Sequence, residues 1–342
     1  MDRLKIAILG CGTWAGLIIE NVYTQLRDIG QLVATVDQRL DRAERLAAPF
    51  GARAYRSLQE AMDHEKIDAV DIRLHHAAHA PAVLEAVSYG KHVLVEKPFA
   101  TSVEDGERMV AAAKTANVVL SVSENYAFLE QVRVAKRLLA ENVIGRLLAV
   151  RSARVFPITT AGGIWIQDPW RLDVRRGGGV LLDQGCHHVN MVRRLVGEIT
   201  HVHAFSDAIP GQKPEDTAVL NLRFANGVIG QQLYCWNTKA LDAQLGPEAI
   251  LTGEDGTIEI HMTYVVEGGG VLLHKPDLPG GQEWRYHGAN YFASTFSVVD
   301  DWVRACRGEK KPAMPGEEGL RDIKVVMAAF RSIETGCEVV VE

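Results

Sequence analysis

The sequence predicts an α/β fold in which a doubly wound parallel sheet is followed by an α+β domain with a large, mostly antiparallel open sheet. Two observations predict this arrangement. Over roughly the first third of the chain, short apolar runs alternate with helical stretches, as in parallel sheets covered on both faces. Later, strand-like runs follow one another with little helix between them, which favours antiparallel pairing. Because 342 residues exceed what one core usually serves, we expect two domains, residues 1–125 and 126–342.

The first domain is expected to alternate between strand and helix from its start. Its apolar runs have the length of strands, and turn residues or helical compositions separate them. The expected strands are Leu4–Leu9, Leu32–Val36, Ala69–Leu74, His92–Val95 and Val118–Val122. The expected helices are Trp14–Arg27, Arg39–Ala48, Pro81–Tyr89 and Val103–Ala116.

The second domain is expected to be built around hairpins. Ala-Asn-Gly at 225–227 and Glu-Asp-Gly at 254–256 are typical hairpin turns. The expected strands are Leu147–Val155, Val202–Phe205, Ala218–Phe224, Val228–Trp236, Ala249–Thr252 and Thr257–Ile260. The expected helices are Val132–Leu139, Val180–Val196, Phe292–Arg307 and Leu320–Glu334. We expect the closing helix, about 317–336, to pack back on the first domain.

Composition and charge exclude several classes of protein. Charged residues make up 23% of the chain and apolar residues 47%, so a disordered or fibrous protein is excluded. The net charge of −6 argues against nucleic acid or anionic membranes as partners, and no apolar run approaches the roughly 18 residues of a membrane span. The N-terminus lacks a signal-peptide pattern, and the five cysteines are scattered without a C-x-x-C pair. We therefore expect a soluble cytoplasmic protein with no nucleic-acid or membrane partner.

A glycine-rich loop directly follows the first expected strand. Gly10, Gly12 and Ala15 match the G-x-G-x-x-G/A fingerprint, and a helical pattern comes next. Gly10 permits a tight turn, and Gly12 lets a pyrophosphate approach the backbone N–H groups at a helix start. Thr13 and Trp14 lie in the same loop and are expected to contact the ligand. This context predicts an NAD(P)-binding Rossmann domain in residues 1–125.

The second expected strand ends at Asp37, which lies 25 residues after Gly12. A carboxylate at this place can accept hydrogen bonds from the ribose diol of NAD and repels the 2′-phosphate of NADP. We therefore predict NAD as the cofactor, with NADP less favoured. Arg39 leaves the second possibility open, because a guanidinium can bind a 2′-phosphate. The alternative interpretation is an ordinary glycine turn with a surface aspartate.

A lysine, Lys97, follows the expected strand His92–Val95, at the edge of an open parallel sheet where ligands bind. Its Glu-Lys-Pro context, the glycine loop and a later Asp-x-Gly-x-His sequence resemble those of the Gfo/Idh/MocA oxidoreductases, which include inositol, glucose–fructose and related sugar dehydrogenases. The resemblance covers the whole chain. The segments that carry it are Gly10–Ala15, His79, Gly90–Pro98, Gly177–Gly179, Asp183–His187 and Gly316–Gly336.

The resemblance implies that Lys97, Asp183 and His187 are the catalytic residues. Elementary chemistry agrees, because oxidising an alcohol by hydride transfer needs a base for the hydroxyl proton and a cation or donor for the developing alkoxide. His187 suits the proton transfer because imidazole titrates near neutral pH. Lys97 can stabilise the oxygen or share the proton. Asp183, four residues before His187, is expected on the same helix face, where it can orient His187 or hold a substrate hydroxyl.

The expected cofactor contacts lie along the ends of the first-domain strands. They are Gly10, Gly12, Thr13, Trp14, Asp37, Leu74, His75, His79, Glu96, Lys97 and Asn125. Family members often carry Thr-Pro-Asn where this chain has Leu74, His75 and His76, so the contacts of that loop differ here. His75 and His79 have a spacing that could suit a metal, but no carboxylate or cysteine stands near them in sequence, and we predict no metal.

Two further departures occur around the expected catalytic histidine. Asn190 replaces the family's aspartate three residues after His187, and His188 is an additional titratable group. Asn190 keeps a hydrogen-bonding side chain but loses the charge. We therefore expect these differences to affect the choice of substrate and not the type of reaction.

Residues before the second glycine run are expected to bind the substrate. Tryptophan rings suit the C–H faces of sugars, and Asp168 and Arg171 suit hydroxyls, although Arg171 could instead bind a carboxylate or phosphate. His287 and Tyr291 are either pocket or surface residues. The expected substrate contacts are Lys97, Tyr126, Trp165, Trp170, Arg171, Asp183 and His187.

The sequence therefore predicts an NAD-dependent dehydrogenase acting on a secondary alcohol of a sugar, polyol or sugar derivative. The resemblance implies a homodimer or homotetramer. Two alternatives remain open at this point: an enzyme that oxidises a sugar transiently during elimination or isomerisation, with no net change in the cofactor, and a cofactor-binding sensor without turnover.

Overall fold

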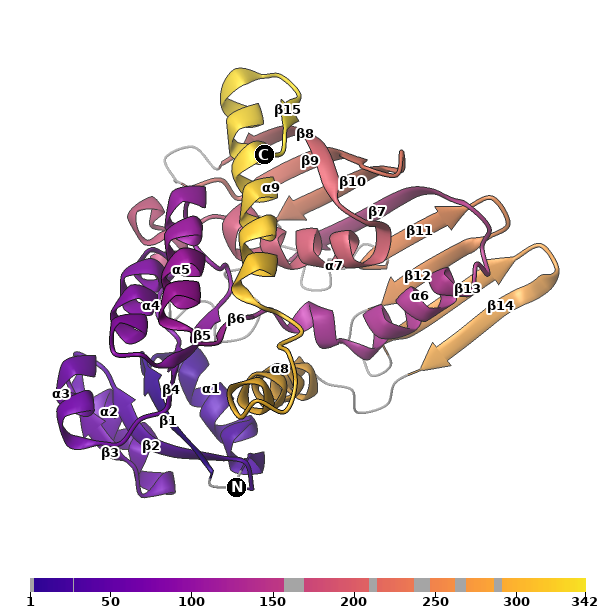
Figure 1. The fold of residues 1–342 in the computed structure, drawn as a ribbon. Coiled ribbons are helices and arrows are strands. Elements are labelled where there is room, and N and C mark those ends of the chain that lie inside the picture. The colour runs from indigo at the N-terminus through magenta and orange to yellow at the C-terminus, as the bar shows by residue number, and fades with distance from the viewer. Residues whose placement is uncertain are drawn as a thin grey trace. The chain divides into compact units, whose positions relative to one another are not determined.

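The computed structural model describes residues 3–26, 28–156, 169–208, 214–236, 247–261, 269–285 and 291–342 of the chain, which is drawn in Figure 1. The chain forms two compact units. Unit 1 comprises Met1–Glu124, Arg175–Gly177 and Thr295–Ile323. Unit 2 comprises Asn125–Val174, Gly178–Ser294 and Lys324–Glu342.

Unit 1 contains a six-stranded sheet in the order β3-β2-β1-β4-β5-β6, and every neighbouring pair is parallel. Its strands are β1 (Leu4–Leu9), β2 (Gly30–Val36), β3 (Arg53–Tyr55), β4 (Ala69–Ile72), β5 (His92–Glu96) and β6 (Leu120–Ser123). Its helices include α1 (Thr13–Asn21), α2 (Leu40–Ala47), α3 (Leu58–His64), α4 (His79–Ser88) and α5 (Val103–Ala116). The strand order reverses between β1 and β4, which is the place where doubly wound sheets bind ligands.

Several details of unit 1 differ from the expected elements. The strand expected over Ala69–Leu74 ends at Ile72. The helix expected over Trp14–Arg27 ends at Asn21 and is followed by the short 3-10 turn η1 (Tyr23–Gln25). The structure adds β3 and α3, which the sequence pattern did not indicate because β3 has only three residues. The start of α3 is fixed by Ser57, whose side chain accepts a hydrogen bond from Glu60 N.

Unit 1 also includes Thr295–Ile323, which the sequence-based division places in the second domain. The segment extends the hydrogen bonding of β6, because Val122 N donates to Met314 O at 3.0 Å. It contains most of α8 (Tyr291–Cys306) and the beginning of α9 (Gly316–Thr335). A Cβ at Gly319 would lie 2.8 Å from the Phe99 side chain, so α9 starts in close contact with the loop after β5.

Unit 2 contains a nine-stranded sheet in the order β14-β13-β12-β11-β7-β10-β9-β8-β15. Only the pair β7–β10 is parallel among the pairs of this sheet that the structure describes. The strands are β7 (Leu147–Val155), β8 (Ile199–Asp207), β9 (Thr217–Phe224), β10 (Ile229–Cys235), β11 (Ala249–Gly253), β12 (Thr257–His261), β13 (Gly270–Lys275), β14 (Leu278–Arg285) and β15 (Val339–Val340). The predicted α/β class, with a parallel sheet and a mostly antiparallel one, is confirmed.

Helices cover one face of the unit 2 sheet. Helix α6 (Glu130–Ala140) packs on β12 and β13, and α7 (Cys186–Val196) packs on β7, as Figure 1 shows. Strand β9 alternates between buried and accessible residues, as a sheet with one covered face requires. Among the described residues, no helix is long and apolar enough to cross a membrane.

Candidate active site

The glycine loop after β1 has the geometry that the sequence predicted. Gly10 has a φ of 98°, and a Cβ there would lie 2.6 Å from the Arg73 carbonyl oxygen, so the position requires glycine. Gly12 is the N-cap of α1, with no side-chain cap, and a Cβ on it would meet nothing within 4 Å. The helix start therefore offers backbone N–H groups beside open space. This arrangement fits the pyrophosphate of a dinucleotide.

Asp37 directly follows β2, and two backbone groups fix its carboxylate. Cys11 N donates to Oδ2 at 2.8 Å, and Arg39 N donates to Oδ1 at 2.8 Å. Each oxygen keeps a second lone pair, and the half-buried residue can accept the two hydroxyls of a ribose. The Arg39 guanidinium lies 2.9 Å from the Asp41 carboxylate, in an exposed ion pair of the kind that contributes little to stability.

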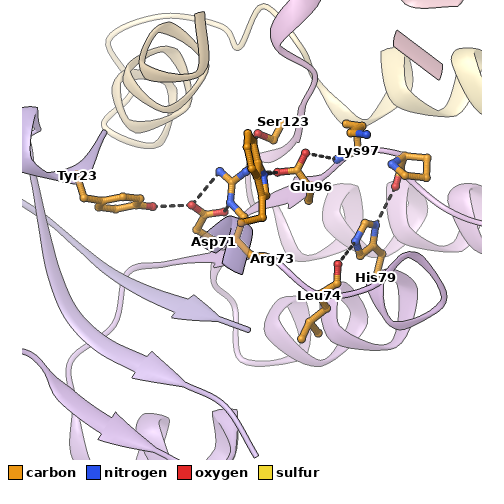
Figure 2. Close-up of polar contacts among 10 residues, drawn as sticks. Tyr23, Asp71, Arg73, Leu74, His79, Glu96, Lys97 and Ser123 are labelled. Carbon is orange, nitrogen blue, oxygen red and sulfur yellow. Dashed lines mark hydrogen bonds and ion pairs between the residues drawn. The ribbon is translucent and has the colours of Figure 1, made fainter. Parts of the chain in front are cut away.

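The carboxylate of Glu96, the last residue of β5, is held by three partners. Oε2 accepts a hydrogen bond from Trp14 Nε1 at 3.0 Å and contacts the Arg73 guanidinium. Oε1 accepts from Lys97 N at 3.1 Å. Figure 2 shows Arg73, Glu96 and Lys97 together at the ends of neighbouring strands. Lys97 itself is buried, with 8% of its surface exposed.

His79 and Leu74 lie next to this group and are joined to each other (Figure 2). The His79 ring nitrogens lie 2.8 Å from the Pro98 carbonyl oxygen and 3.1 Å from that of Leu74. Burial lowers the pKa of His79, although these two carbonyls work against the change. A neutral ring donates to only one of the two. Because both ring nitrogens face backbone carbonyls, His79 fastens the loop after β4 to the loop after β5.

In unit 2, Asp183 and His187 lie on one continuous helical segment. It begins as a π-helical turn, Leu181–Gly185, and runs into α7, so the regular helix expected from Val180 starts with a wider turn. Asp183 is fully buried, and its Oδ2 accepts a hydrogen bond from Arg171 Nε at 3.1 Å. The Arg171 guanidinium also stacks on the Trp170 ring, 4.5 Å from its centroid.

The imidazole of His187 stacks on the ring of Tyr126. Their centroids are 4.4 Å apart and their planes differ by 16°. The Tyr126 hydroxyl donates to Glu248 Oε1 at 3.2 Å, and His188 Nε2 lies 3.1 Å from the same oxygen. A buried carboxylate that the sequence did not single out therefore holds the ring against which His187 packs.

Glu248 is buried and also lies near a cation, Arg154, whose Nη1 is 3.5 Å from Glu248 Oε2. Burial by itself would raise the pKa of the Glu248 carboxyl. Arg154, His188 and Tyr126 outweigh burial and hold that pKa below its usual range. Glu248 is therefore an anion at neutral pH.

Comparisons with known proteins identify the family of this chain. Residues 4–124 match a family model described as an oxidoreductase family with an NAD-binding Rossmann fold, and residues 132–259 match the GFO/IDH/MocA C-terminal domain. The chain is 32% identical to dTDP-3,4-didehydro-2,6-dideoxy-alpha-D-glucose 3-reductase of Saccharopolyspora spinosa, over 97% of this chain and 88% of that protein. This chain belongs to the Gfo/Idh/MocA family. It is also 27% identical to 1,5-anhydro-D-fructose reductase of Ensifer adhaerens, over 90% of each protein.

A solved structure has the same fold. Levoglucosan dehydrogenase, in a complex with NADH and levoglucosan, superimposes with a TM-score of 0.86 at 22% identity, over 99% of this chain and 100% of that chain. At this level of identity the likeness shows the shared fold.

Trp165, Asp168 and His287 lie outside the described residues, as does the side chain of Tyr291. Asn125 is buried, and its amide nitrogen donates to Ser294 Oγ at 2.9 Å within unit 2.

The buried charged residues Asp71, Arg73, Arg154 and Glu248 were not predicted from the sequence. For Arg73 a signal existed, because the sequence Asp71-Ile72-Arg73 places charges inside a run expected to be a buried strand. Glu248 stands beside the turn-like Gly246-Pro247 and has no such local signal.

Proposed function

We propose that this chain is an NAD-dependent dehydrogenase that transfers hydride reversibly between a secondary alcohol of a sugar, polyol or sugar derivative and the nicotinamide. One observation carries the proposal: the glycine turn follows β1, Asp37 follows β2 and Lys97 follows β5, all in one parallel sheet. In such a sheet the carboxyl ends of the strands lie at the same edge, where ligands bind. The relatives named as sugar reductases support the substrate class.

When bound, the nicotinamide ring accepts or releases hydride. The residues of the chain handle the accompanying proton and charge. We propose that His187 takes the hydroxyl proton while the substrate C–H bond breaks and the carbonyl forms. Lys97 stabilises the negative charge that develops on the substrate oxygen. In the reverse direction, His187 returns the proton to that oxygen.

The surroundings of His187 suit this role. Stacking on Tyr126 restricts rotation of the imidazole, and Tyr126 is in turn held through its hydroxyl by Glu248. Asp183, which accepts a hydrogen bond from Arg171, is proposed to orient His187 or to accept a substrate hydroxyl. Because Arg171 is already engaged with this carboxylate, the pair favours hydroxyl recognition over binding of a substrate anion. Trp170 is proposed to pack against the apolar face of a sugar.

The cofactor residues are proposed to serve different parts of the dinucleotide. Gly10, Gly12, Thr13 and Trp14 are proposed to surround the pyrophosphate, and Asp37 to accept the ribose hydroxyls and so favour NAD over NADP. Leu74, His75 and Glu96 are proposed to contact the nicotinamide half. His79 and Asn125 are engaged with Pro98 and Ser294, so we propose that they shape the cofactor site through these neighbours.

We further propose a homodimer or homotetramer that works in the cytoplasm. On the open sheet of unit 2, Phe205 and Ile229 are 58% and 56% exposed, and we propose that this sheet forms the contact between subunits. The five cysteines are free, as in proteins of a reducing compartment.

The proposal is tested by the absorbance of reduced nicotinamide, with purified protein, a panel of sugars, polyols and sugar acids, and NAD or NADP in parallel. We expect NADH to form with at least one neutral sugar or polyol. Absence of NADH with every compound, despite NAD binding, would contradict the proposal. Mass spectrometry of the sugars then separates transient oxidation, which alters the sugar, from a sensor, which leaves it unchanged.

A further inference from the structure

Arg73 is a buried guanidinium at the centre of unit 1. It follows β4 immediately, and its side chain has no exposed surface. Nη2 donates to Asp71 Oδ2 at 3.0 Å, and Nε lies 2.7 Å from Asp71 Oδ1. Nη1 contacts Glu96 Oε2 and donates to Ser123 Oγ at 3.0 Å. One side chain thus joins the ends of β4, β5 and β6, as Figure 2 shows.

On the side away from Glu96, a tyrosine binds the Asp71 carboxyl. The Tyr23 hydroxyl donates to Asp71 Oδ2 at 2.7 Å, and Tyr23 is buried (Figure 2). Burial raises the pKa of the Asp71 carboxyl, while Arg73 and Tyr23 work against that rise. Burial opposes the charge of Arg73, but Asp71 and Glu96 outweigh it and raise the pKa of the guanidinium. Arg73 is therefore a permanent cation between two carboxylates.

Through Glu96, Arg73 is connected to residues that are proposed to bind the cofactor and the substrate. The Glu96 carboxylate that Arg73 contacts also accepts hydrogen bonds from Lys97 N and from Trp14 Nε1. The backbone of Arg73 also packs against Gly10, because a Cβ on Gly10 would approach the Arg73 carbonyl oxygen to 2.6 Å. Movement of Arg73 would therefore displace the glycine turn, the start of α1 and the peptide that carries Lys97.

Stability alone does not account for this group. Apolar residues of similar volume often replace a buried ion pair without loss of stability, because the charges must be taken out of water. The surrounding strand ends are apolar, with Ile72, Val95 and Val122 all buried. The presence of the Arg73 guanidinium among these apolar residues is better explained by the position in which it holds the Glu96 carboxylate.

We propose that Arg73 is a positioning residue for the dehydrogenase reaction: buttressed by Asp71 and Tyr23, it fixes the Glu96 carboxylate and, through it, Lys97 and Trp14. The inference rests on the proposed function. It assigns to this chain a determinant of the cofactor site that lies outside the glycine loop and outside the Glu-Lys-Pro sequence.

The principal test replaces the guanidinium and one of its carboxyl partners together, as Arg73→Met with Asp71→Asn, so that Asp71 is not left as a second buried carboxyl without a cation. Glu96 loses its ion pair with Arg73 but keeps the hydrogen bonds from Lys97 N and Trp14 Nε1. We expect kcat to fall about 100-fold, because small displacements of reacting groups have effects of this size. The sugar KM should stay within about threefold, while the Kd for NADH, read from nicotinamide fluorescence, should rise about tenfold. Unfolding in urea is measured in parallel to ensure that the assays use folded protein.

A milder pair of variants guards against misfolding. Tyr23→Phe removes only the outer hydrogen bond and should lower kcat about twofold to fivefold, in line with the loss of one buttressing hydrogen bond. Tyr55→Phe is the matched control, because the buried Tyr55 also donates to a carboxylate, Glu65, at 2.7 Å, but in a different part of unit 1. Its kcat should not change.

The outcomes separate this inference from the proposed function. If the Arg73 variant matches the wild type in kcat and NADH affinity but loses stability in urea, Arg73 supports only the fold and the inference is wrong. Equal effects of Tyr23→Phe and Tyr55→Phe would also overturn it. If the wild type oxidises no sugar, the proposed function fails, and the NADH affinity of the Arg73 variant still tests the positioning of the cofactor residues.

Discussion

Two buried glutamates, Glu96 in unit 1 and Glu248 in unit 2, each contact an arginine, but the two clusters are built from different kinds of elements. Two of the partners of Glu96, Arg73 and Lys97 N, follow neighbouring parallel strands, and the third, Trp14, lies at the start of α1. The partners of Glu248 lie 60 and 122 residues away along the chain at His188 and Tyr126, and the group acts on a side-chain ring. The first cluster follows from the order of the strands, whereas the second depends on the complete fold of unit 2.

The two clusters also differ in charge. The Glu96 cluster has two carboxylates, Asp71 and Glu96, around one guanidinium, and Lys97 follows directly in the chain. In the Glu248 cluster one carboxylate faces one guanidinium, Arg154, and takes further hydrogen bonds from Tyr126 and His188. We infer that in the first cluster one guanidinium is shared by two carboxyl groups, of which burial raises the pKa of Asp71, while the second keeps a single anion, Glu248, beside Arg154 and the Tyr126 hydroxyl.

The largest effect is expected from removing the carboxylate of the second cluster. Glu248→Leu deprives the buried Arg154 of its carboxylate, and the unfolding free energy should fall by about 3–5 kcal/mol, measured in urea. Glu254→Gln is the control, because Glu254 forms an exposed ion pair with Arg146 in the same unit, and its loss should cost about 0–1 kcal/mol. Equal losses in the two variants would show that Glu248 is not the centre of a buried cluster.

A smaller effect is expected at a carboxylate of unit 1 that lies outside its buried cluster. Asp37→Ser keeps a short polar side chain but removes the charge and one acceptor. The Kd for NAD should rise about tenfold to a hundredfold, while that for NADP should stay the same or fall. Asp41→Asn, on the exposed partner of Arg39, should leave the Kd for NAD unchanged. The role of Asp37 in favouring NAD would be contradicted if the ratio of the Kd for NAD to the Kd for NADP were the same in Asp37→Ser and in the wild type.

The smallest effect concerns a carboxylate of unit 2 that has no cation among its described contacts. Glu215 accepts a hydrogen bond from Leu181 N at 3.0 Å, at the start of the segment that carries Asp183 and His187. Burial raises its pKa to about 7. A carboxyl whose pKa is raised by folding keeps its proton to a higher pH in the folded state than in the unfolded state. The free energy of unfolding therefore falls as the pH rises from about 4.5 to about 7.

Glu215→Gln removes this dependence and keeps an oxygen that can accept from Leu181 N. The variant should match the wild type near pH 4.5 and exceed it by about 1–2 kcal/mol at pH 8, since one unit of pKa corresponds to about 1.4 kcal/mol and Glu215 is only partly buried. Urea unfolding at several pH values measures the difference. A difference that is constant over this range would contradict the raised pKa.

The contrast between the clusters also explains how much the sequence could predict. In unit 1 the chemistry follows each strand directly, so the positions of Gly10, Asp37 and Lys97 could be read from apolar runs and the residues after them. The hydrogen bonds that fix Asp37, from Cys11 N and Arg39 N, follow from the same local order. Arg73 could have been suspected as a charge in a buried run, but its partners on β5 and β6 depend on the order of the strands in the sheet.

In unit 2, Tyr126, Asp183 and His187 were proposed as site residues through resemblance, but their contacts could not be predicted from the sequence. The stacking of His187 on Tyr126 joins residues 61 positions apart, and Glu248 comes from a third segment, directly before β11. Periodicity and spacing do not predict these contacts, because they arise from the packing of η4 (Asn125–Phe128) against α7. The helix prediction over Val180–Val196 was right in extent, but it could not indicate the π-helical turn at Asp183.

The most direct test of the account compares two lysines at opposite ends of β5. Lys97→Ala should lower the rate of NADH formation at least about a hundredfold with the sugar that the wild type oxidises, because the developing alkoxide loses its cation. Its Kd for NADH should stay within about threefold of the wild type, since the glycine loop and Asp37 are intact. Lys91→Ala, before β5, should leave both values unchanged. Near-normal turnover in Lys97→Ala would contradict the assignment of this residue to the reaction.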